Sequence, residues 1–226
     1  MGRLRGPAGW ATLGALGVGL FLVLTAPADF QQGNSVRIMY VHVPSAKMAL
    51  LVYLFITIAA IVHLWRKSAR ADLLVEAAVP VGTAFAAVTL ATGSIWGKPM
   101  WGAWWAWDAR LTSMLVLLIL YVGLAALRSA LEDPVKAGRA TSVLVLIGAV
   151  DLPIIHFSVT WWRTLHQPAS FKGSGTPAIE GALLTPLLAM SLAFVVLGIY
   201  LVLLRAGLVA DRRRLEALEM EEPTHG

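Results

Sequence analysis

The 226-residue chain contains no cysteine and few charged residues. Without cysteine, the chain has no disulfide, no thiolate-ligated metal centre, no thiol relay and no Cys-x-x-Cys-His attachment motif. A Walker A sequence is also missing, because "GSIWGKPM" has a Gly-Lys pair without the required spacing or hydroxyl residue. The chain is therefore not expected to hydrolyse ATP by itself. We also find no internal repeat and no segment with the composition of a soluble domain.

Apolar residues dominate in place of charge. The chain is 58% hydrophobic and 14% charged, with a mean hydropathy of +0.74, which is too apolar for an ordinary soluble domain. A spanning helix needs about 20 mostly apolar residues, whereas barrel strands would alternate over about ten. Candidate spans centre on residues 10–28, 46–65, 74–95, 111–128, 141–161 and 181–204. The sequence predicts an all-α integral membrane protein, a single domain (residues 1–226) with six transmembrane helices.

The first apolar segment resembles a signal sequence, because Arg3 and Arg5 precede it. Its apolar run is longer than an ordinary signal core, and "APADF" is a poor match to a small-x-small cleavage site. We therefore expect this segment to be retained as a helix.

Lysine and arginine predict the orientation, since cytoplasmic loops carry more of them. Twelve lie on one side of a six-span arrangement: Arg3, Arg5, Arg66, Lys67, Arg70, Arg128, Lys136, Arg139, Arg205, Arg212, Arg213 and Arg214. Six lie on the other side: Arg37, Lys47, Lys98, Arg110, Arg163 and Lys172. Both termini and the tail, about 206–226, are thus predicted to be cytoplasmic. The segments at about 27–45, 96–110 and 162–180 face outward. This bias explains the net charge of +5 better than nucleic-acid binding does.

The second outward segment, "WGKPMWGAWWAWD" at residues 96–108, holds five of the nine tryptophans. Glycine and proline are expected to end the third helix near Trp96. Trp101, Trp104, Trp105 and Asp108 then follow i, i+3, i+4, i+7 spacing, which predicts a short surface helix with these residues on one face. Trp107 falls off that stripe. An aromatic belt at the membrane surface is one interpretation, but the density of indoles favours a platform for a planar ligand. Asp108 is expected to cap the following helix.

Two histidines flank this segment in the other outward loops. His42 precedes Pro44 where the second helix is expected to begin, and His166 follows "WW" after the fifth. A lone loop histidine is usually solvated surface, but two beside an aromatic platform match the axial ligands of haem iron. Cations on the same side would suit the haem propionates: Arg37, Lys98, Arg110 and Arg163.

The fifth span is unusual because it carries Asp151 and His156. Ionisable groups at this depth are costly and often functional. Pro153 between them loosens the backbone hydrogen bonding. Hydrogen bonds between helices explain these residues somewhat better than a proton path does.

These residues also carry a family resemblance. "WGKPMWGAWWAWDARLTS" resembles the WWD signature of haem-handling proteins. The flanking "APADFQQGNSVRIMYVHVP" and "LPIIHFSVTWWRTLHQPAS" are similar to the haem exporter protein C family of bacterial cytochrome c maturation. The similarity covers roughly residues 26–170. At position 151 this family commonly has asparagine, so Asp151 departs from the pattern.

The resemblance implies that the chain lies in the bacterial inner membrane and holds haem b at the periplasmic face. The iron would be ligated by His42 and His166. The implied platform comprises Trp96, Trp101, Trp104, Trp105, Trp107 and Asp108. Arg37 and Arg110 are the candidates for propionate contact. The implied partners are a periplasmic haem chaperone (the E component), a small single-span D subunit, and an ABC transporter of A and B subunits whose ATP hydrolysis releases the loaded chaperone.

The sequence thus predicts a haem-binding delivery protein that positions haem and is not an enzyme. A membrane b-type cytochrome is one alternative, although it would place histidine pairs inside the spans. A transporter subunit with a structural tryptophan loop is another. A haem synthetase would need a larger periplasmic domain than this chain offers.

Overall fold

The computed structural model describes residues 2–166 and 179–221, and these are almost entirely helical. The elements in order are α1 (Gly2–Thr25), the 3-10 helix η1 (Asn34–Ile38), α2 (Met39–Arg66), α3 (Ala69–Trp101), α4 (Ala109–Ala130), α5 (Pro134–Gly148), α6 (Asp151–Trp161) and α7 (Gly181–Glu221). Within the described ranges there is no β-strand, only an isolated bridge between Asp29 and Gly33. The predicted all-α class is confirmed.

Six helical segments among the described residues are long and apolar enough to cross a membrane, which confirms the predicted number of spans. The span at residues 34–66 joins η1 to α2, and the span at 134–161 joins α5 to α6. Helix α7 continues beyond the predicted sixth span as far as Glu221. Residues 167–178 of the third predicted outward segment, and 222–226 of the predicted tail, lie outside the described residues.

The fifth span contains a break that one continuous helix over 141–161 would lack. Ala149 and Val150 form a turn between α5 and α6. There the N–H of Leu152 donates to the carbonyl of Ala149 at 3.2 Å, three residues earlier instead of four. Pro153 explains the break, because it lacks the N–H that would donate to the same carbonyl in a regular α-helix.

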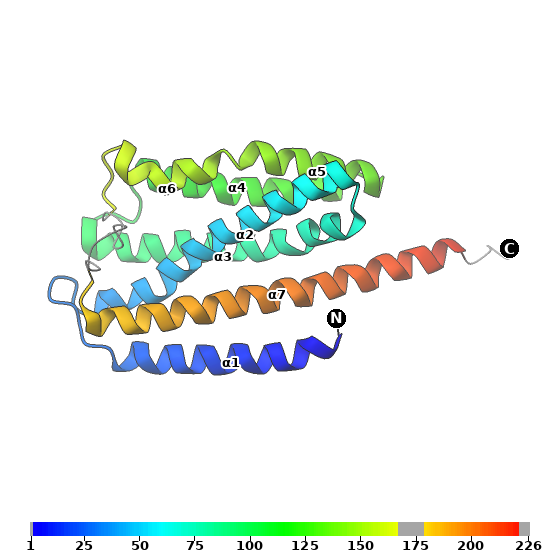
Figure 1. Cartoon of the computed structure of the whole chain (residues 1–226). Helices are drawn as coiled ribbons and strands as arrows, with labels where there is room; N and C mark the ends of the chain where they lie inside the picture. The colour runs from blue at the N-terminus through cyan, green and yellow to red at the C-terminus, as the bar shows by residue number, and fades with distance from the viewer. Residues whose placement is uncertain (1, 167–178, 222–226) are drawn as a thin grey trace.

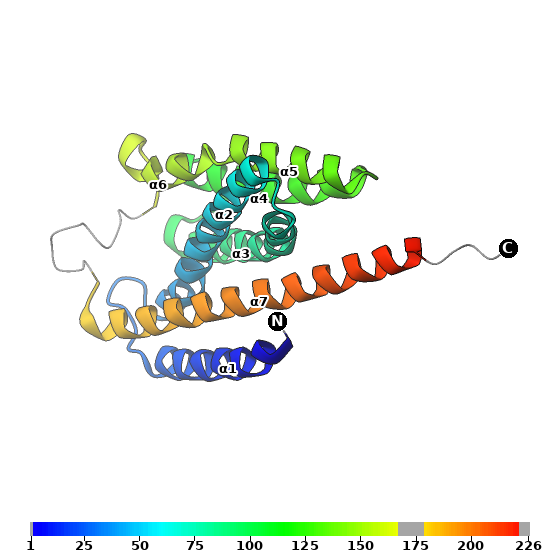
Figure 2. The same ribbon diagram turned by 45° about the vertical axis from the view of Figure 1, so that its right-hand side comes forward.

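The helices run roughly along one direction, and α1 packs along α7 (Figures 1 and 2). Helix α2 crosses the bundle obliquely, so that it contacts α7 near its start and α5 near its end (Figure 1). We call the end that carries η1, residues 102–108 and the end of α6 the aromatic end. The opposite end, where α4 ends and the last turns of α7 lie, is the arginine end.

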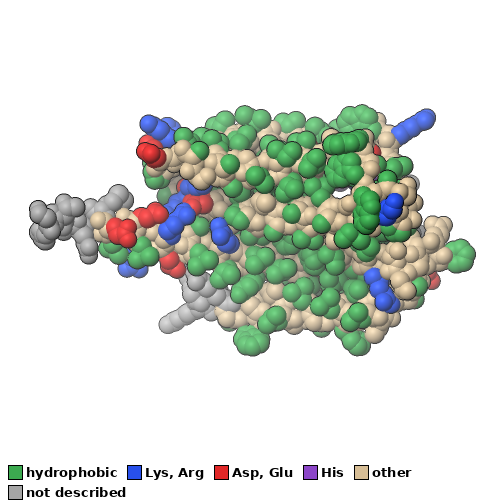
Figure 3. All heavy atoms as spheres, turned by 180° about the vertical axis from the view of Figure 1, so that it is seen from behind, with side chains coloured by type: hydrophobic (Ala, Val, Ile, Leu, Met, Phe, Trp, Pro, Cys, Tyr) green, Lys and Arg blue, Asp and Glu red, His purple; other side chains and the backbone are tan. Residues whose placement is uncertain are grey.

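The surface between the two ends is mainly apolar. Figure 3 shows hydrophobic side chains over most of the bundle, with lysine and arginine gathered toward its ends. Large side chains such as Leu13, Phe21, Leu54 and Ile119 are exposed on this belt. Such exposure fits a hydrocarbon environment, because lipid tails are as apolar as these side chains.

Buried ion pairs join three helices at the arginine end. Asp72 of α3 accepts hydrogen bonds from the two Nη atoms of Arg128 of α4, at 2.7 and 2.9 Å. Arg213 of α7 donates to Asp72 at 2.7 Å and also to Glu76, which accepts from Arg212 as well. The two carboxylate side chains are only 9% and 10% exposed. Charge-assisted pairs of this kind fix α3, α4 and α7 relative to one another.

Candidate functional site

The tryptophan-rich segment begins inside α3. The expectation that Gly97 and Pro99 end the third helix near Trp96 is wrong, because α3 continues to Trp101. The indole of Trp101 packs over Gly97, where a Cβ would lie only 3.0 Å from the ring. Gly102 then ends the helix with φ at 76°, a conformation that glycine adopts without strain.

Residues 102–108 are not helical, so the predicted surface helix is wrong. The spacing of Trp101, Trp104, Trp105 and Asp108 therefore does not reflect one helical face. Instead, the hydroxyl of Ser94 in α3 donates to the carbonyl of Trp104 at 2.8 Å. The segment folds back against the helix that precedes it.

Asp108 anchors the start of α4 and the segment after α6. Its Oδ1 accepts from the N–H of Leu111 at 2.8 Å, which confirms the expected capping role. Its Oδ2 accepts from the N–H of Leu165 at 3.2 Å. One carboxylate therefore joins the tryptophan-rich segment to the residue that precedes His166.

His42 lies in the first turns of α2 and is only 8% exposed, so it is not the loop residue that the sequence suggested. Its Nδ1 lies 3.1 Å from the carbonyl oxygen of Thr89 and 3.1 Å from Oγ1 of Thr92. Because a carbonyl can only accept, Nδ1 carries the proton and Nε2 presents a lone pair. Gly93 makes room for the ring, since a Cβ there would lie 3.0 Å from Cε1 of His42.

His166 lies beyond α6, with 13% of its side chain exposed. Its ring packs against that of Trp101, with centroids 5.2 Å apart. Its Nδ1 is 3.8 Å from Oδ2 of Asp108 and has no hydrogen-bond partner among the described residues. Burial lowers the pKa of His166, and the nearby cation of Arg110 lowers it further, whereas Asp108 opposes the shift. The imidazole is therefore neutral at pH 7 and able to ligate a metal.

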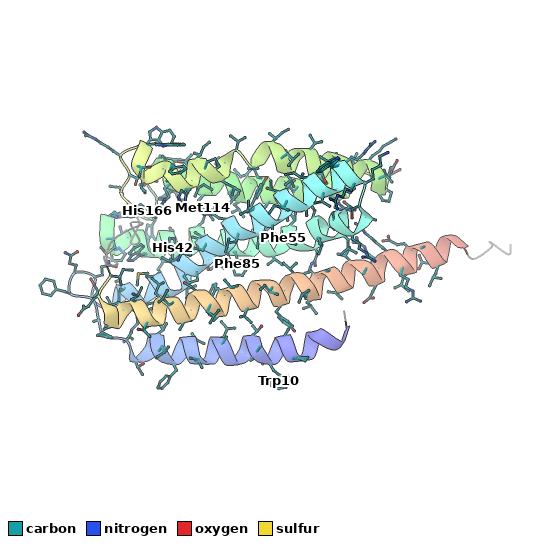
Figure 4. All side chains as sticks on the ribbon, in the orientation of Figure 1. Trp10, His42, Phe55, Phe85, Met114 and His166 are labelled. Carbon is teal, nitrogen blue, oxygen red and sulfur yellow. The ribbon has the colours of Figure 1, made fainter. Side chains whose placement is uncertain are left out.

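The two histidine rings lie near each other at the aromatic end, where Figure 4 labels both. Their centroids are 6.3 Å apart and their planes differ by 32°. Two imidazoles that ligate one iron from opposite sides place their centroids roughly 6–6.5 Å apart, because each metal–nitrogen bond is about 2 Å long and the ring centre lies about 1 Å beyond it. The separation of His42 and His166 therefore fits one iron atom between them.

A bare metal ion fits this site poorly. The described residues contain no group of three or more His, Cys, Asp or Glu side chains that could hold one. Two imidazoles suffice for haem iron, because the porphyrin supplies the remaining nitrogens. Two imidazoles beside a cavity would therefore suit a metalloporphyrin better than a bare metal ion.

A cavity of about 650 Å³ opens beside the two histidines. Its volume lies within the range of about 300–1,000 Å³ that is typical of sites for organic ligands. Five residues of the predicted haem site line it: His42, Trp96, Trp105, Arg110 and His166. Apolar side chains from several helices complete the wall, including Leu90, Met114 and Leu187. An apolar cavity with a few polar groups suits a porphyrin.

Besides Trp101, which packs against His166, the tryptophans of this segment form two groups. Trp96 is 8% exposed, lies 6.0 Å from the ring of His42, and donates from Nε1 to Oε1 of Gln32 at 3.1 Å. Trp105 lines the cavity, and its Nε1 has no partner in the part of the chain that the structure describes. Trp104 and Trp107 are 57% and 78% exposed. The segment is thus part cavity wall and part outward surface.

The two candidate propionate contacts also differ. Arg110 lines the cavity and is held there by Ser158, whose Oγ accepts from Nε at 3.2 Å, and by the carbonyl of Ile155 at 3.5 Å. Arg37 is not part of the cavity wall, and its Nη2 donates to the carbonyl of Ala26 at 3.4 Å. Of the two, only Arg110 faces the space beside the histidines.

Several supporting residues were missed by sequence reasoning. Gln32 fixes Trp96, Thr89 and Thr92 orient His42, and Ser158 holds Arg110. The available signal was the presence of hydroxyl residues within otherwise apolar spans, where such groups need partners.

Comparison with known proteins identifies the family. The family described as Heme exporter protein C matches residues 1–221 of this chain. A Heme exporter protein C of Bradyrhizobium diazoefficiens is 47% identical over 210 residues, 93% of this chain and 80% of the relative. That of Escherichia coli K12 is 49% identical over 192 residues, 84% of this chain and 77% of the relative. A mitochondrial protein of Marchantia polymorpha, named for cytochrome c biosynthesis, is 43% identical over 182 residues, 80% of this chain and 77% of its own length. The chain therefore belongs to the haem exporter protein C family, which handles haem in cytochrome c maturation.

Proposed function

We propose that this chain binds haem b at the periplasmic face of the bacterial inner membrane and delivers it to a periplasmic haem chaperone. The observation that carries this proposal is the pair formed by His42 and His166. The centroids of their rings are 6.3 Å apart beside a cavity of about 650 Å³. His42 lies near the indole of Trp96, and His166 lies near that of Trp101. This arrangement suits bis-histidine ligation of one haem.

The orientation follows from the distribution of cations. The arginine end carries most of the lysine and arginine residues, and the positive-inside rule assigns that end to the cytoplasm. The start of α1 and the end of α7 both lie toward it (Figure 1). Both termini are therefore cytoplasmic in this proposal, and the aromatic end faces the periplasm.

Each residue of the site has a distinct role in holding the cargo. Nε2 of His42 and the imidazole of His166 ligate the iron, while Trp96 and Trp105 contact the porphyrin from the cavity wall. Arg110 meets a propionate, for which a planar guanidinium is well suited. We do not assign Arg37 this role, because it is bonded to the backbone outside the cavity.

The exposed indoles mark the side from which haem is presented. Trp104 and Trp107 face outward beside the site, and amphipathic aromatic residues are favoured at protein interfaces. A haem held with one edge accessible there is oriented for bond formation with the chaperone. Such positioning needs no acid or base from this chain. The protein is then a delivery component and not an enzyme.

The partners in this proposal are those that the family resemblance implies. They are the periplasmic chaperone (the E component), the single-span D subunit, and the A and B subunits of an ABC transporter. ATP hydrolysis would come from the transporter, since this chain has no Walker A sequence.

A membrane b-type cytochrome is the second candidate. One observation favours it: His42 lies within a spanning segment, and His156 lines the same cavity. A cytochrome subunit would retain its haem through repeated reduction by a quinol. A delivery protein would lose its haem to the chaperone.

Co-expression with the chaperone tests the proposal. Wild-type protein should carry low-spin haem and should load the chaperone covalently. The variants His42→Ala and His166→Ala should express normally, lose that spectrum, and leave the chaperone unloaded. Normal haem and normal loading in both variants would overturn the proposed ligation.

A further inference from the structure

The cavity beside the histidines extends away from the aromatic end, and delivery of haem to the periplasm does not require this extension. Away from the two histidines, α2 and α6 both contribute to the cavity wall, together with residues of α3, α4 and α7. The wall residues from α2 and α6 include Val43, Lys47, Leu50, Ile155, His156 and Thr160. Helix α2 slants from α5 toward α7 and has few contacts with α6 (Figure 1). Lys47 of α2 and His156 and Thr160 of α6 are exposed although they line the cavity, so the cavity opens to the outside between these two helices.

Two ionisable side chains stand on opposite sides of this opening, at membrane depth. Lys47 lies eight residues after Met39, the first residue of α2, which is about 12 Å along the helix axis. His156 lies five residues before Trp161, the last residue of α6, or about 7–8 Å. Both belong to spanning segments and both are exposed. Ionisable residues in this position are costly and typically mark the path of a polar or charged cargo.

The chemistry of the opening matches an amphipathic metalloporphyrin. Leu50 and Met114 provide apolar wall for the porphyrin face. Lys47 offers an ammonium for a propionate, and His156 offers an imidazole for iron. The ring of His156 packs edge-on against Phe157, with centroids 4.7 Å apart, which restricts its orientation at the opening.

We infer that the opening between α2 and α6 is a lateral portal through which haem passes from the bilayer into the His42–His166 site. Lys47 and His156 contact the porphyrin on the way and are not its final ligands. This inference rests on the proposed haem site. With the portal, the bilayer becomes the source of the haem. His156, which is not one of the two proposed ligands, also gains a role.

Because the chain has no cysteine, a single introduced thiol can be labelled without side reactions. Thr160→Cys places the thiol on an exposed wall residue of the portal, and a bulky maleimide there should obstruct it. Val122→Cys is the matched control, since Val122 is 53% exposed on α4 and is not part of the cavity wall. Both proteins would be labelled, reconstituted into lipid vesicles, and mixed with vesicles that contain haem b.

The portal affects the rate of loading and not the final site. Labelled Thr160→Cys should therefore load at least about tenfold more slowly than labelled Val122→Cys, yet reach the same low-spin spectrum. Equal rates would overturn the portal. If wild-type protein takes up no low-spin haem, or if His42→Ala loads normally, the proposed haem site itself fails.

His156→Leu and Lys47→Gln test the same idea without a label. Each should slow loading from vesicles several-fold while the final spectrum stays that of wild type. Loss of the final low-spin spectrum in His156→Leu would make His156 a permanent ligand and would contradict its assignment to the portal. Unchanged loading rates in both variants would also contradict the inference.

Discussion

The two ends of this bundle bury different kinds of polar group. At the arginine end, Asp72 and Glu76 are each met by arginines from α4 and α7. At the aromatic end, Nδ1 of His166 and Nε1 of Trp105 are buried without partners among the described residues. Buried polar groups normally find partners within the protein. Unpartnered atoms occur at both ends, however, because Nε2 of His63 and Oγ1 of Thr141 are also buried without partners among the described residues and line a cavity at the arginine end. The ends therefore differ in the kind of side chain that faces the cavity, carboxylate–arginine pairs at one end and imidazole and indole rings at the other.

Cavity volume alone does not make this distinction. The arginine end also has a cavity, of about 970 Å³, which is larger than the one beside the histidines. Its wall includes the charged residues of the ion-pair network, whereas the smaller cavity is mainly apolar and bounded by imidazole and indole rings. The chemistry of the wall, more than its size, is therefore what favours the smaller cavity as the proposed haem site.

The largest expected effect is a loss of stability when the ion-pair network at the arginine end is broken. Asp72→Ala removes one of the two carboxylates shared by Arg128 and Arg213 and leaves Glu76 alone to pair with three arginines. Breaking a buried pair in this way costs about 3–5 kcal/mol. The variant should melt at a clearly lower temperature in detergent, while any folded fraction keeps the wild-type haem spectrum.

Asp133→Ala is the control for that experiment. Asp133 caps α5 in full exposure, through hydrogen bonds from the N–H groups of Val135 and Lys136. Its loss should lower the melting temperature much less. Equal loss of stability in the two variants would contradict the structural role assigned to the buried network.

The next effect concerns only the aromatic end. In Gly93→Ala the new Cβ would lie 3.0 Å from Cε1 of His42, so the imidazole must shift. Overpacking typically costs about 1–3 kcal/mol, and we expect haem affinity to fall by about tenfold, which corresponds to about 1.4 kcal/mol. Gly123→Ala, where a Cβ meets nothing within 4 Å, should bind haem like wild type. A haem titration followed by absorbance compares them, and identical affinities would show that the ring of His42 need not be held where it is.

A smaller effect is expected on the pH dependence of haem binding, through protonation of His166. Because burial and Arg110 lower the pKa of His166, its imidazole stays neutral at pH 7 and becomes protonated only as the pH falls below its ordinary value of 6.5. Haem binding should be constant at pH values above that ordinary value and decline only as the pH falls further below it, because protons then compete with iron for the imidazole. Asp108 opposes the pKa shift, so Asp108→Asn should move this decline to lower pH, since asparagine keeps the helix cap. Arg110→Gln should move it to higher pH. Titrations that coincide for all three proteins would exclude His166 as the titrating ligand.

The smallest effects on haem binding are expected among the tryptophans. Trp105→Ala removes cavity wall and should lower haem affinity several-fold, whereas Trp104→Ala, at an exposed position, should leave the spectrum unchanged and reduce only transfer to the chaperone. Absorbance of the purified variants and covalent haem on the chaperone measure the two properties separately. Equal effects of both substitutions on affinity would mean that the indoles act as one platform.

The sequence predicted the architecture because apolar run length determines which segments can span a membrane. Its errors lie where local patterns competed with tertiary packing. The stripe of Trp101, Trp104, Trp105 and Asp108 suggested a helix, but Gly102 ends α3 within it. Gly97 and Pro99 suggested the end of a helix that packing instead extends to Trp101.

For the proposed site, the sequence indicated which residue types take part, and the structure shows how those residues are arranged. His42 and His166 could be nominated because they flank the tryptophan-rich segment, and the structure brings them together. Arg110 lines the cavity, whereas Arg37 does not. The position of Arg110 depends on how α4 packs against α6, which local sequence patterns do not specify. The same holds for the contact between His42 and Thr89, which crosses from α2 to α3.

The most direct test of the account is the coordination state of the iron. Purified wild-type protein would be loaded with ferric haem b and its low-temperature electron paramagnetic resonance spectrum recorded, together with those of His42→Met and His166→Met. The account predicts one low-spin, bis-imidazole haem per chain in the wild type, and a different axial ligand set in each variant. A high-spin, five-coordinate wild type, or a bis-imidazole signal that survives in both variants, would contradict it.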